Sequence, residues 1–239
     1  MFFLHLKVKR KLVIVINTLI IAIILYLFYR FPEKSYYNQE ELKHKYYENL
    51  VGPIYANLSI LNYLDVETEL LERQKLNIYN GGFSYQSNFI WQQKIAIIIP
   101  FRNRDTQLNT FLNHMHPFLI KQKLNYRIFV VEQVENSTFN RAMLLNIGFV
   151  ESLQYDFFNC FIFHDIDLLP ENDHNIYGCE NAPSHFSVAI DTMNYTLPYP
   201  SIFGGIEVFK KSQFMAINGF SNLFWGWGGE DDDLYDRYY

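Results

Sequence analysis

The chain has 239 residues, a formal net charge of −5, 22 Phe and 18 Tyr. Nucleic-acid binding depends on clustered Lys and Arg that neutralise phosphates, so this acidic chain, which has no basic stripe after its N-terminus, is not expected to bind nucleic acid. The many aromatic residues exclude a disordered chain, which would be poor in them. They fit an aromatic-rich core, and some would also suit stacking on sugar rings.

An uncharged run, LVIVINTLIIAIILYLFY, occupies residues 12–29. About 18 largely apolar residues can cross a bilayer as a helix. Four basic residues lie between positions 7 and 11, whereas Arg30 alone closely follows the run, and the more positive flank stays in the cytosol. We therefore expect a cytosolic tail over residues 1–11, a single transmembrane helix over 12–29 and a lumenal body.

The alternative for this run is a cleaved signal peptide. The apolar region of a signal peptide has about 7–15 residues and ends at a small-residue cleavage site. The run here is longer and ends in Tyr-Leu-Phe-Tyr-Arg, which favours the membrane anchor.

Residues 30–80 are polar and are expected to form a stem, with a possible helix near residues 66–75. The sequence Asn80-Gly-Gly82 then marks a break before the main folded domain, residues 81–239. Three sequons for N-glycosylation lie in the expected lumenal part, at Asn57, Asn136 and Asn194.

From Lys94 onward, short apolar runs alternate with segments of helical spacing. This alternation predicts an α/β fold with a parallel sheet, whose ligands bind at the carboxyl ends of the strands. A further strand is expected at residues 203–209 and a short helix at 210–217. The expected strands of the alternating part are 94–99, 126–131 and 160–164, and its helices are 105–120 and 140–152.

Two charged segments follow expected strands and should meet at one edge of the sheet. Asp165-Ile-Asp167 offers carboxylate oxygens that suit Mn²⁺ or Mg²⁺, and such an ion would neutralise charge on a leaving nucleoside diphosphate. Arg102, Arg104 and Arg141 could bind phosphates through bidentate hydrogen bonds. The alternatives are a chance acidic turn and ordinary surface charge.

The segment from Trp225 to Asp233 alternates Trp and Gly and then has four acidic residues. Glycines let the backbone hinge and tryptophans offer flat faces, so the segment suits a lid that closes over a sugar. The acids could begin a helix, where they complement its dipole. Four acids in a row beside such a loop also suggest recognition of hydroxyl groups and a general base.

The two cysteines, Cys160 and Cys179, allow two interpretations. In an oxidising lumen they can form a disulfide, which we favour. Together with His164 and His174 they could instead hold zinc, although the spacing is only loosely that of a zinc finger. Taken alone, these histidines and His185 are expected to be structural.

Six segments of the sequence closely resemble motifs of the β-1,4-galactosyltransferase family, and they occur in the family's order. They are Pro100-Phe-Arg-Asn-Arg104, Phe139-Asn-Arg-Ala142, Phe161-x-Phe-x-Asp-x-Asp167, Asn172-Asp-His-Asn175, Phe203-Gly-Gly205 and Trp225-Gly-Trp-Gly-Gly-Glu-Asp-Asp-Asp233. The resemblance covers the sequence from near Ile95 to its last residues.

This resemblance implies a GT-A fold, a Rossmann-like α/β fold that uses a UDP-sugar and Mn²⁺, with Mg²⁺ as a possible substitute. It implies an inverting transfer that makes a β-1,4 bond to a glycan with a terminal N-acetylglucosamine (GlcNAc). Residues 81–239 would be the catalytic domain of a type II Golgi membrane protein.

The resemblance also implies roles for individual residues. Asp231 would be the base that takes the proton from the acceptor hydroxyl, Asp167 would be a metal ligand, and Cys160 and Cys179 would be joined. The acceptor would be bound by Gly229, Glu230, Asp231 and Asp232. The donor would be bound by Pro100, Phe101, Arg102, Asn103, Arg104, Phe139, Asn140, Arg141, Asp165, Ile166, Asp167, Ile202, Gly205 and Trp227.

Ile202 departs from the resemblance, because vertebrate members of the family typically have Tyr before Phe-Gly-Gly. Tyr crowds an N-acetyl group on the donor sugar, and Ile leaves more room, as in invertebrate members that use UDP-N-acetylgalactosamine (UDP-GalNAc). We therefore expect UDP-GalNAc as the donor, with UDP-galactose as the alternative.

Family members also continue well beyond the acidic cluster, into a region with a Met and a His that complete the metal site. The sequence is therefore expected to be either a fragment of a longer enzyme or a form with impaired catalysis. The impaired form would bind UDP-sugar or glycan, or would pair with an active homologue.

Overall fold

The computed structural model describes residues 50–56, 58, 75–85, 93–134 and 137–238, which all belong to the compact unit of residues 47–239. The expected tail and anchor, nearly all of the possible helix at 66–75, and the sequons at Asn57 and Asn136 lie outside the described residues. Within the described ranges, no helix is both long and apolar enough to cross a membrane.

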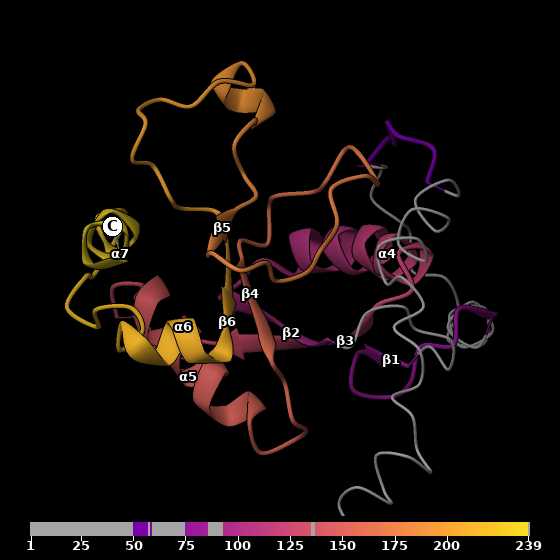
Figure 1. Ribbon diagram of the computed structural model, residues 1–239, viewed down its shortest axis with the longest axis horizontal. Coiled ribbons are helices and arrows are strands. Elements are labelled where there is room, and N and C mark those ends of the chain that lie inside the picture. The colour runs from indigo at the N-terminus through magenta and orange to yellow at the C-terminus, as the bar shows by residue number, and fades with distance from the viewer. Residues whose placement is uncertain (1–49, 57, 59–74, 86–92, 135–136, 239) are drawn as a thin grey trace, which may run out of the picture. The chain divides into compact units, whose positions relative to one another are not determined.

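A six-stranded sheet forms the centre of the described part, in the order β1-β3-β2-β4-β6-β5 (Figure 1). Strands β2, β3 and β4 are parallel, and Ile97 of β2 lies between Ile128 of β3 and Ile162 of β4. Strands β1, β5 and β6 run antiparallel to their neighbours. The bounds are β1 Phe83–Ser84, β2 Lys94–Phe101, β3 Asn125–Glu132, β4 Cys160–His164, β5 Ser184–His185 and β6 Ile206–Lys210.

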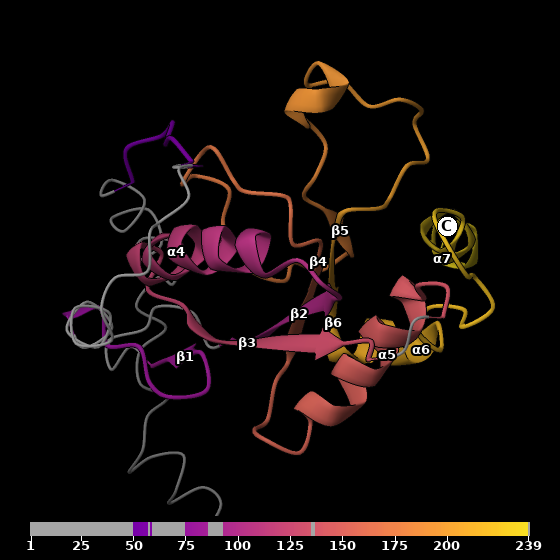
Figure 2. The same ribbon diagram turned by 180° about the vertical axis from the view of Figure 1, so that it is seen from behind.

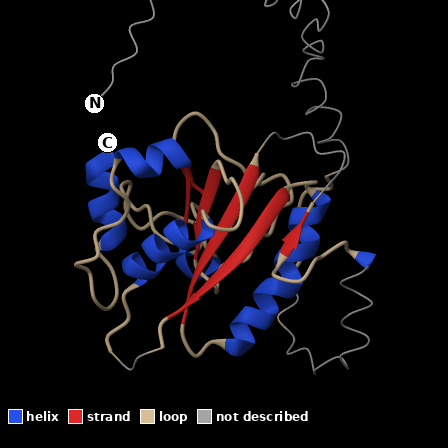
Figure 3. Ribbon diagram, turned by 90° about the horizontal axis from the view of Figure 1, so that it is seen from below, coloured by secondary structure: helices blue, strands red, loops and turns tan. Residues whose placement is uncertain are grey.

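Helices cover both faces of this sheet (Figures 2 and 3). Alternate residues of β2 point to opposite faces, so Ile97 packs with Phe111 and Met115 of α4, whereas Ile98 packs with Leu145 and Phe149 of α5. The two resulting hydrophobic clusters hold the strand ends in place. The helices are α4 Asp105–Lys121, α5 Arg141–Ser152, α6 Lys211–Ala216 and α7 Glu230–Tyr238, with a short 3₁₀ helix η1 at Asp191–Met193.

The expected α/β alternation from Lys94 to His164 is confirmed, but two expectations near β6 need correction. The strand begins at Ile206 and not at residue 203, because Gly205 has a φ of 94° and interrupts extended structure. The sheet is also mixed and not purely parallel. Between β4 and β6 the chain forms β5 and η1 but no α-helix, so β6 returns beside β4 in the antiparallel direction.

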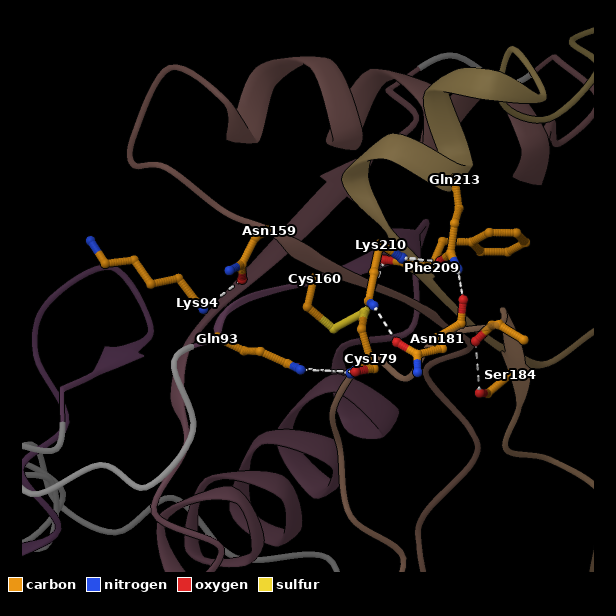
Figure 4. The surroundings of a disulfide bond; sticks show 11 residues. Gln93, Lys94, Asn159, Cys160, Cys179, Asn181, Ser184, Phe209, Lys210 and Gln213 are labelled. Carbon is orange, nitrogen blue, oxygen red and sulfur yellow. Dashed lines mark hydrogen bonds between the residues drawn. A yellow bond between two sulfur atoms is a disulfide. The ribbon is translucent and has the colours of Figure 1, made fainter. Parts of the chain in front are cut away.

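The expected disulfide is confirmed, and the zinc alternative is wrong. Cys160 and Cys179 form a disulfide, with their Cα atoms 5.5 Å apart. The side chain of Gln93 donates to the backbone oxygen of Cys179 and accepts from its backbone N–H (Figure 4). His164 instead shares a hydrogen bond with the Tyr177 hydroxyl, and His174 contacts the backbone oxygen of Leu50. The disulfide therefore ties the start of β4 to the loop that follows it.

Candidate functional site

The expected basic and acidic segments do lie together, at the carboxyl ends of β2 and β4. After the buried Pro100 and Phe101, the chain turns at Asn103, which has a φ of 53°. Arg104 then reaches Asp167 with an Nη1–Oδ2 distance of 2.6 Å. Both side chains of this pair are about half exposed, at 51% and 53%, so water competes for the contact.

Arg141, in the first turn of α5, is the centre of a buried ionic cluster. The preceding Asn140 caps the helix, because its Oδ1 accepts a hydrogen bond from the backbone N–H of Met143. From this position Arg141 contacts three acids that lie far apart in the sequence. Its Nε lies 2.6 Å from Asp165 Oδ1, its Nη2 lies 3.0 Å from Glu207 Oε2, and its Nη1 lies 3.4 Å from Glu230 Oε1.

Burial sets the charge states in this cluster, which we call the Arg141 cluster (Arg141, Asp165, Glu207 and Glu230). Burial opposes the charge of the Arg141 guanidinium, but Asp165 and Glu207 outweigh it and hold the pKa of Arg141 well above its usual value. Burial, only partly offset by Arg141, raises the pKa of Glu207 to about 8. Burial likewise raises the pKa of Asp165 and of Glu230.

The acidic run from Glu230 begins α7, as the helix-dipole argument predicts. Glu230 turns inward to Arg141, and Asp232 accepts a hydrogen bond from the Tyr199 hydroxyl at 3.0 Å. The Asp231 carboxylate lies against the backbone at Gly204, where a Cβ atom would stand 2.5 Å from Asp231 Oδ2. Gly204 is therefore needed for this placement of the expected base.

Only part of the Trp/Gly segment, residues 225–229, lies close to these groups. The backbone N–H of Gly226 donates to the Phe139 oxygen at 2.8 Å, which attaches the segment to the start of α5. The side chain of Trp227 is 99% exposed and does not cover the ionic cluster. Positive φ angles at Gly226, Gly228 and Gly229 give the backbone conformations that other residues adopt poorly.

The other expected donor residues occupy different environments. Arg102 donates to the backbone oxygen of Ser137 at 2.6 Å and lies over the Phe139 ring, 5.1 Å from its centroid. These two contacts stabilise the loop before α5. Ile166 is buried under the sheet edge. Ile202 is half-buried, and the oxygen of Gly205 accepts a hydrogen bond from the Asp165 N–H, which joins the Phe-Gly-Gly turn to the acidic segment.

The acidic segment fits part of a site for a hard divalent cation. Asp167 presents a half-exposed carboxylate, and Mg²⁺-type sites often use one or two carboxylates together with substrate phosphates and water. Asp165 is already engaged by Arg141. The described residues contain no group of three or more His, Cys, Asp or Glu side chains placed to hold a metal.

Sequence reasoning missed two residues that the structure places in this site. Glu207 is the one acid in the largely apolar strand IEVFK. Its position in such a strand could have marked it as a candidate site residue from the sequence. Tyr199 is exposed in the loop before β6, and no sequence signal marked its bond to Asp232.

Two family models together match most of the chain. Residues 45–180 match the N-terminal region of glycosyl transferase group 7, and residues 184–239 match the N-terminal domain of galactosyltransferase.

Similar proteins agree with these matches. The chain is 48% identical to bovine β-1,4-galactosyltransferase 1 over 188 residues, which are 79% of this chain and 46% of that protein. It is 51% identical to human β-1,4-galactosyltransferase 4 over 59% of this chain and 41% of that protein. The chain thus spans about half the length of the curated relatives it matches.

A solved structure supports the same fold. The structure of a mutant of Drosophila β-1,4-galactosyltransferase 7 in complex with manganese, UDP-galactose and xylobiose matches with a TM-score of 0.54 and 36% identity, over 61% of this chain and 60% of that one. The fold, the ordered motifs and the family matches agree, and the chain therefore belongs to the glycosyltransferase group 7 family, together with the β-1,4-galactosyltransferases.

Proposed function

We propose that this chain carries the sugar-transfer site of an inverting β-1,4-glycosyltransferase, which moves galactose or GalNAc from a UDP-sugar to a terminal GlcNAc of a glycan. The observation that carries the proposal is Arg141, which contacts Asp165 on the proposed donor side and Glu230 on the proposed acceptor side. The names of the relatives, and the manganese, UDP-galactose and xylobiose in the Drosophila complex, support the same reaction class.

In the proposed reaction, the acceptor O4 attacks the anomeric carbon of the donor while the bond from that carbon to the diphosphate breaks. Asp231 takes the proton from O4, and UDP leaves with the bonding electron pair. Glu230 and Asp232 hold the acceptor in position. Asp167 would be a ligand of manganese, and the bound ion would neutralise charge at the leaving diphosphate.

Asp231→Asn tests this assignment. A general base contributes about 10²–10⁴-fold to a rate, so the variant should bind UDP normally with Mn²⁺ and lose transfer by that factor. Asp233→Asn is the matched control, because the Asp233 carboxylate faces Arg237 at 2.8 Å and should leave transfer unchanged. Near-normal transfer by Asp231→Asn would remove Asp231 from its role.

We propose UDP-GalNAc as the preferred donor, on the strength of Ile202. Ile202 has no hydroxyl and a shorter reach than Tyr, so the acetamide of GalNAc can enter against an apolar wall. Contacts of this size shift selectivity by about 1–3 kcal/mol, or roughly 10–200-fold. Ile202→Tyr should therefore move the ratio of initial rates toward UDP-galactose. An unchanged ratio, or a strong preference of the unaltered chain for UDP-galactose, would contradict this proposal.

A second function is a UDP-sugar-binding protein with impaired catalysis, which could also pair with an active homologue. The observation that motivates it is that the described residues contain no group of three or more His, Cys, Asp or Glu side chains placed to hold a metal ion. Calorimetric UDP binding with Mn²⁺, without transfer to a GlcNAc acceptor under the same conditions, would support this second function over the first.

We further propose that the body is lumenal and is held to the Golgi membrane by residues 12–29. Asn194 is exposed at the end of η1, where an N-glycan can be attached without disturbing the core. Protease added to sealed vesicles should spare the body, and Asn194→Gln should lose the mass of one glycan. Digestion of the body in sealed vesicles would exclude this topology.

A further inference from the structure

Glu207 is a fully buried acid in an apolar setting. It is the second residue of β6, opposite Phe163 of β4 and His185 of β5, and its exposed fraction is 0%. The neighbouring Phe163 and Phe209 belong to the hydrophobic cluster on this face of the sheet. An apolar side chain would suit this position for packing alone.

The hydrogen bonds of Glu207 are incomplete. Its Oε2 accepts from Arg141 Nη2 at 3.0 Å, whereas Oε1 has no hydrogen-bond partner in the part of the chain that the structure describes. A buried polar atom without a hydrogen-bond partner destabilises the folded state, because it has lost its hydrogen bonds to water. Glu207 therefore destabilises the fold through its unpaired oxygen, and its contact with Arg141 is the feature of this side chain that an apolar residue could not provide.

The contact with Glu207 is the shorter of two that hold Nη2 of Arg141, since the other acceptor, the Gly205 oxygen, lies at 3.5 Å. Nε of Arg141 faces Asp165, and Nη1 faces Glu230 at the longer distance of 3.4 Å. With Nη2 released, the guanidinium could rotate toward Asp165 and give up the longer contact with Glu230. Because a guanidinium is planar and rigid, holding three of its nitrogens defines its orientation.

We propose that Glu207 is a positioning residue for sugar transfer, which holds Arg141 so that one guanidinium aligns Asp165 on the donor side with Glu230 on the acceptor side. The proposal rests on the proposed function of this site. Glu207 acts through Arg141 and need not touch donor or acceptor.

Two substitutions separate positioning from packing. Burial raises the pKa of Glu207 to about 8, which favours the neutral carboxyl, and Oε2 accepts from Arg141. Glu207→Gln is neutral, has nearly the same shape and can accept the same hydrogen bond, so it should preserve the position of Arg141. Glu207→Leu keeps the apolar packing with Phe163 and Phe209 but removes the 3.0 Å contact of Nη2, which then retains only its longer contact of 3.5 Å with the Gly205 oxygen.

The first measurement needs no ligand. In the full chain with ¹⁵N-labelled arginine, the Nε–H signal of Arg141 is assigned by its loss in Arg141→Lys. Its hydrogen exchange should be equally slow in the unaltered chain and Glu207→Gln, and at least about tenfold faster in Glu207→Leu. Arg237, which bonds Asp233 through Nε at 2.8 Å, is the internal control and should not change. Equal protection of Arg141 in Glu207→Leu would overturn the proposal.

The second measurement is UDP binding with Mn²⁺ at pH 7, followed by calorimetry. Loss of a hydrogen bond to a charged group should weaken binding by about 10–100-fold in Glu207→Leu, and Glu207→Gln should restore it. A loosened Arg141 with unchanged UDP affinity would also overturn the proposal, because Glu207 would then position nothing for the ligand. No binding by the unaltered chain would instead refute the proposed function, and the positioning role with it, whatever the exchange data show.

Discussion

Two arginine–carboxylate contacts stand at the same edge of the sheet and differ in almost every physical respect. Arg141 is largely buried and faces three acids, whereas Arg104 forms one ion pair among the described residues, with Asp167, and both side chains of that pair are about half exposed. Breaking a buried ion pair leaves an uncompensated charge and is costly. An exposed pair contributes little, because water and salt compete with it.

This difference indicates that the Arg141 contacts help to maintain the fold, whereas the Arg104–Asp167 contact can be broken more easily. The Arg141 cluster joins α5, β6, α7 and the segment after β4, so its arrangement is part of the fold. The exposed Arg104–Asp167 contact can break at lower cost, as the proposed binding of a cation and a diphosphate would require.

The largest expected effect is on folding stability when the Arg141 cluster is broken. Arg141→Met keeps much of the side-chain volume but leaves Asp165, Glu207 and Glu230 without their cation. We expect a loss of about 3–5 kcal/mol in the free energy of unfolding, measured by urea denaturation. A loss below about 1 kcal/mol would show that the two arginines are equivalent after all.

A smaller effect is the pH dependence of stability. The pKa of Glu207 is about 8 in the folded chain, above the value of about 4.3 expected when unfolded. The protonation of Glu207 in the folded chain adds to the free energy of unfolding. This contribution is complete below the unfolded pKa and is lost as pH rises toward 8. Below about pH 6.5 the buried His164, whose pKa is lowered to about 4, has the opposite effect. The melting temperature should therefore fall most clearly between about pH 6.5 and pH 8, and Glu207→Gln should flatten this fall.

Other groups surround Glu207, and the control must account for them. Asp165 and Glu230 also have raised pKa values and add to the same trend, so some slope should remain in Glu207→Gln. An identical slope in both proteins would show that Glu207 does not titrate in this range. The charged or titratable groups near it on the neighbouring elements include Arg141 of α5, His164 of β4, Asp165 after β4, His185 of β5, and Glu230 and Asp231 of α7.

The sequence predicts the parallel centre of the fold well, because its signals are local. The run KIAIII ends at Pro100, and the helical spacing of Leu108, Leu112 and Met115 gives the inward face of α4. Strands β1 and β5 have only two residues each, too few to show an alternating pattern. The direction of β6 depends on the absence of an α-helix between residues 165 and 205. The apolar pattern of residues 206–210 does not by itself reveal that direction.

The site is predictable only where a motif is contiguous. The segments after β2 and β4 are expected together, because carboxyl ends of parallel strands meet at one edge, and Arg104 and Asp167 do so. The partner of Glu207 lies 66 residues away at Arg141, so an acid in an apolar strand does not identify what it contacts. The 99% exposure of Trp227 likewise does not follow from the Trp/Gly pattern.

The smallest expected effect completes the comparison. Arg104→Met removes a half-exposed contact, which should cost no more than about 1 kcal/mol of unfolding free energy. The test is urea denaturation, which leaves the ionic strength free to vary, at about 0.05 M and 1 M NaCl. The Debye length falls to about 3 Å at 1 M salt, so the difference between the unaltered chain and Arg104→Met should nearly vanish there.

The loss in Arg141→Met should persist at both salt concentrations, because the buried acids are shielded from the ions. If the cost of Arg104→Met exceeds about 2 kcal/mol or does not respond to salt, the Arg104–Asp167 contact is part of the architecture. It would then be unsuited to yield to a cation, and Asp167 would be a poor choice of metal ligand.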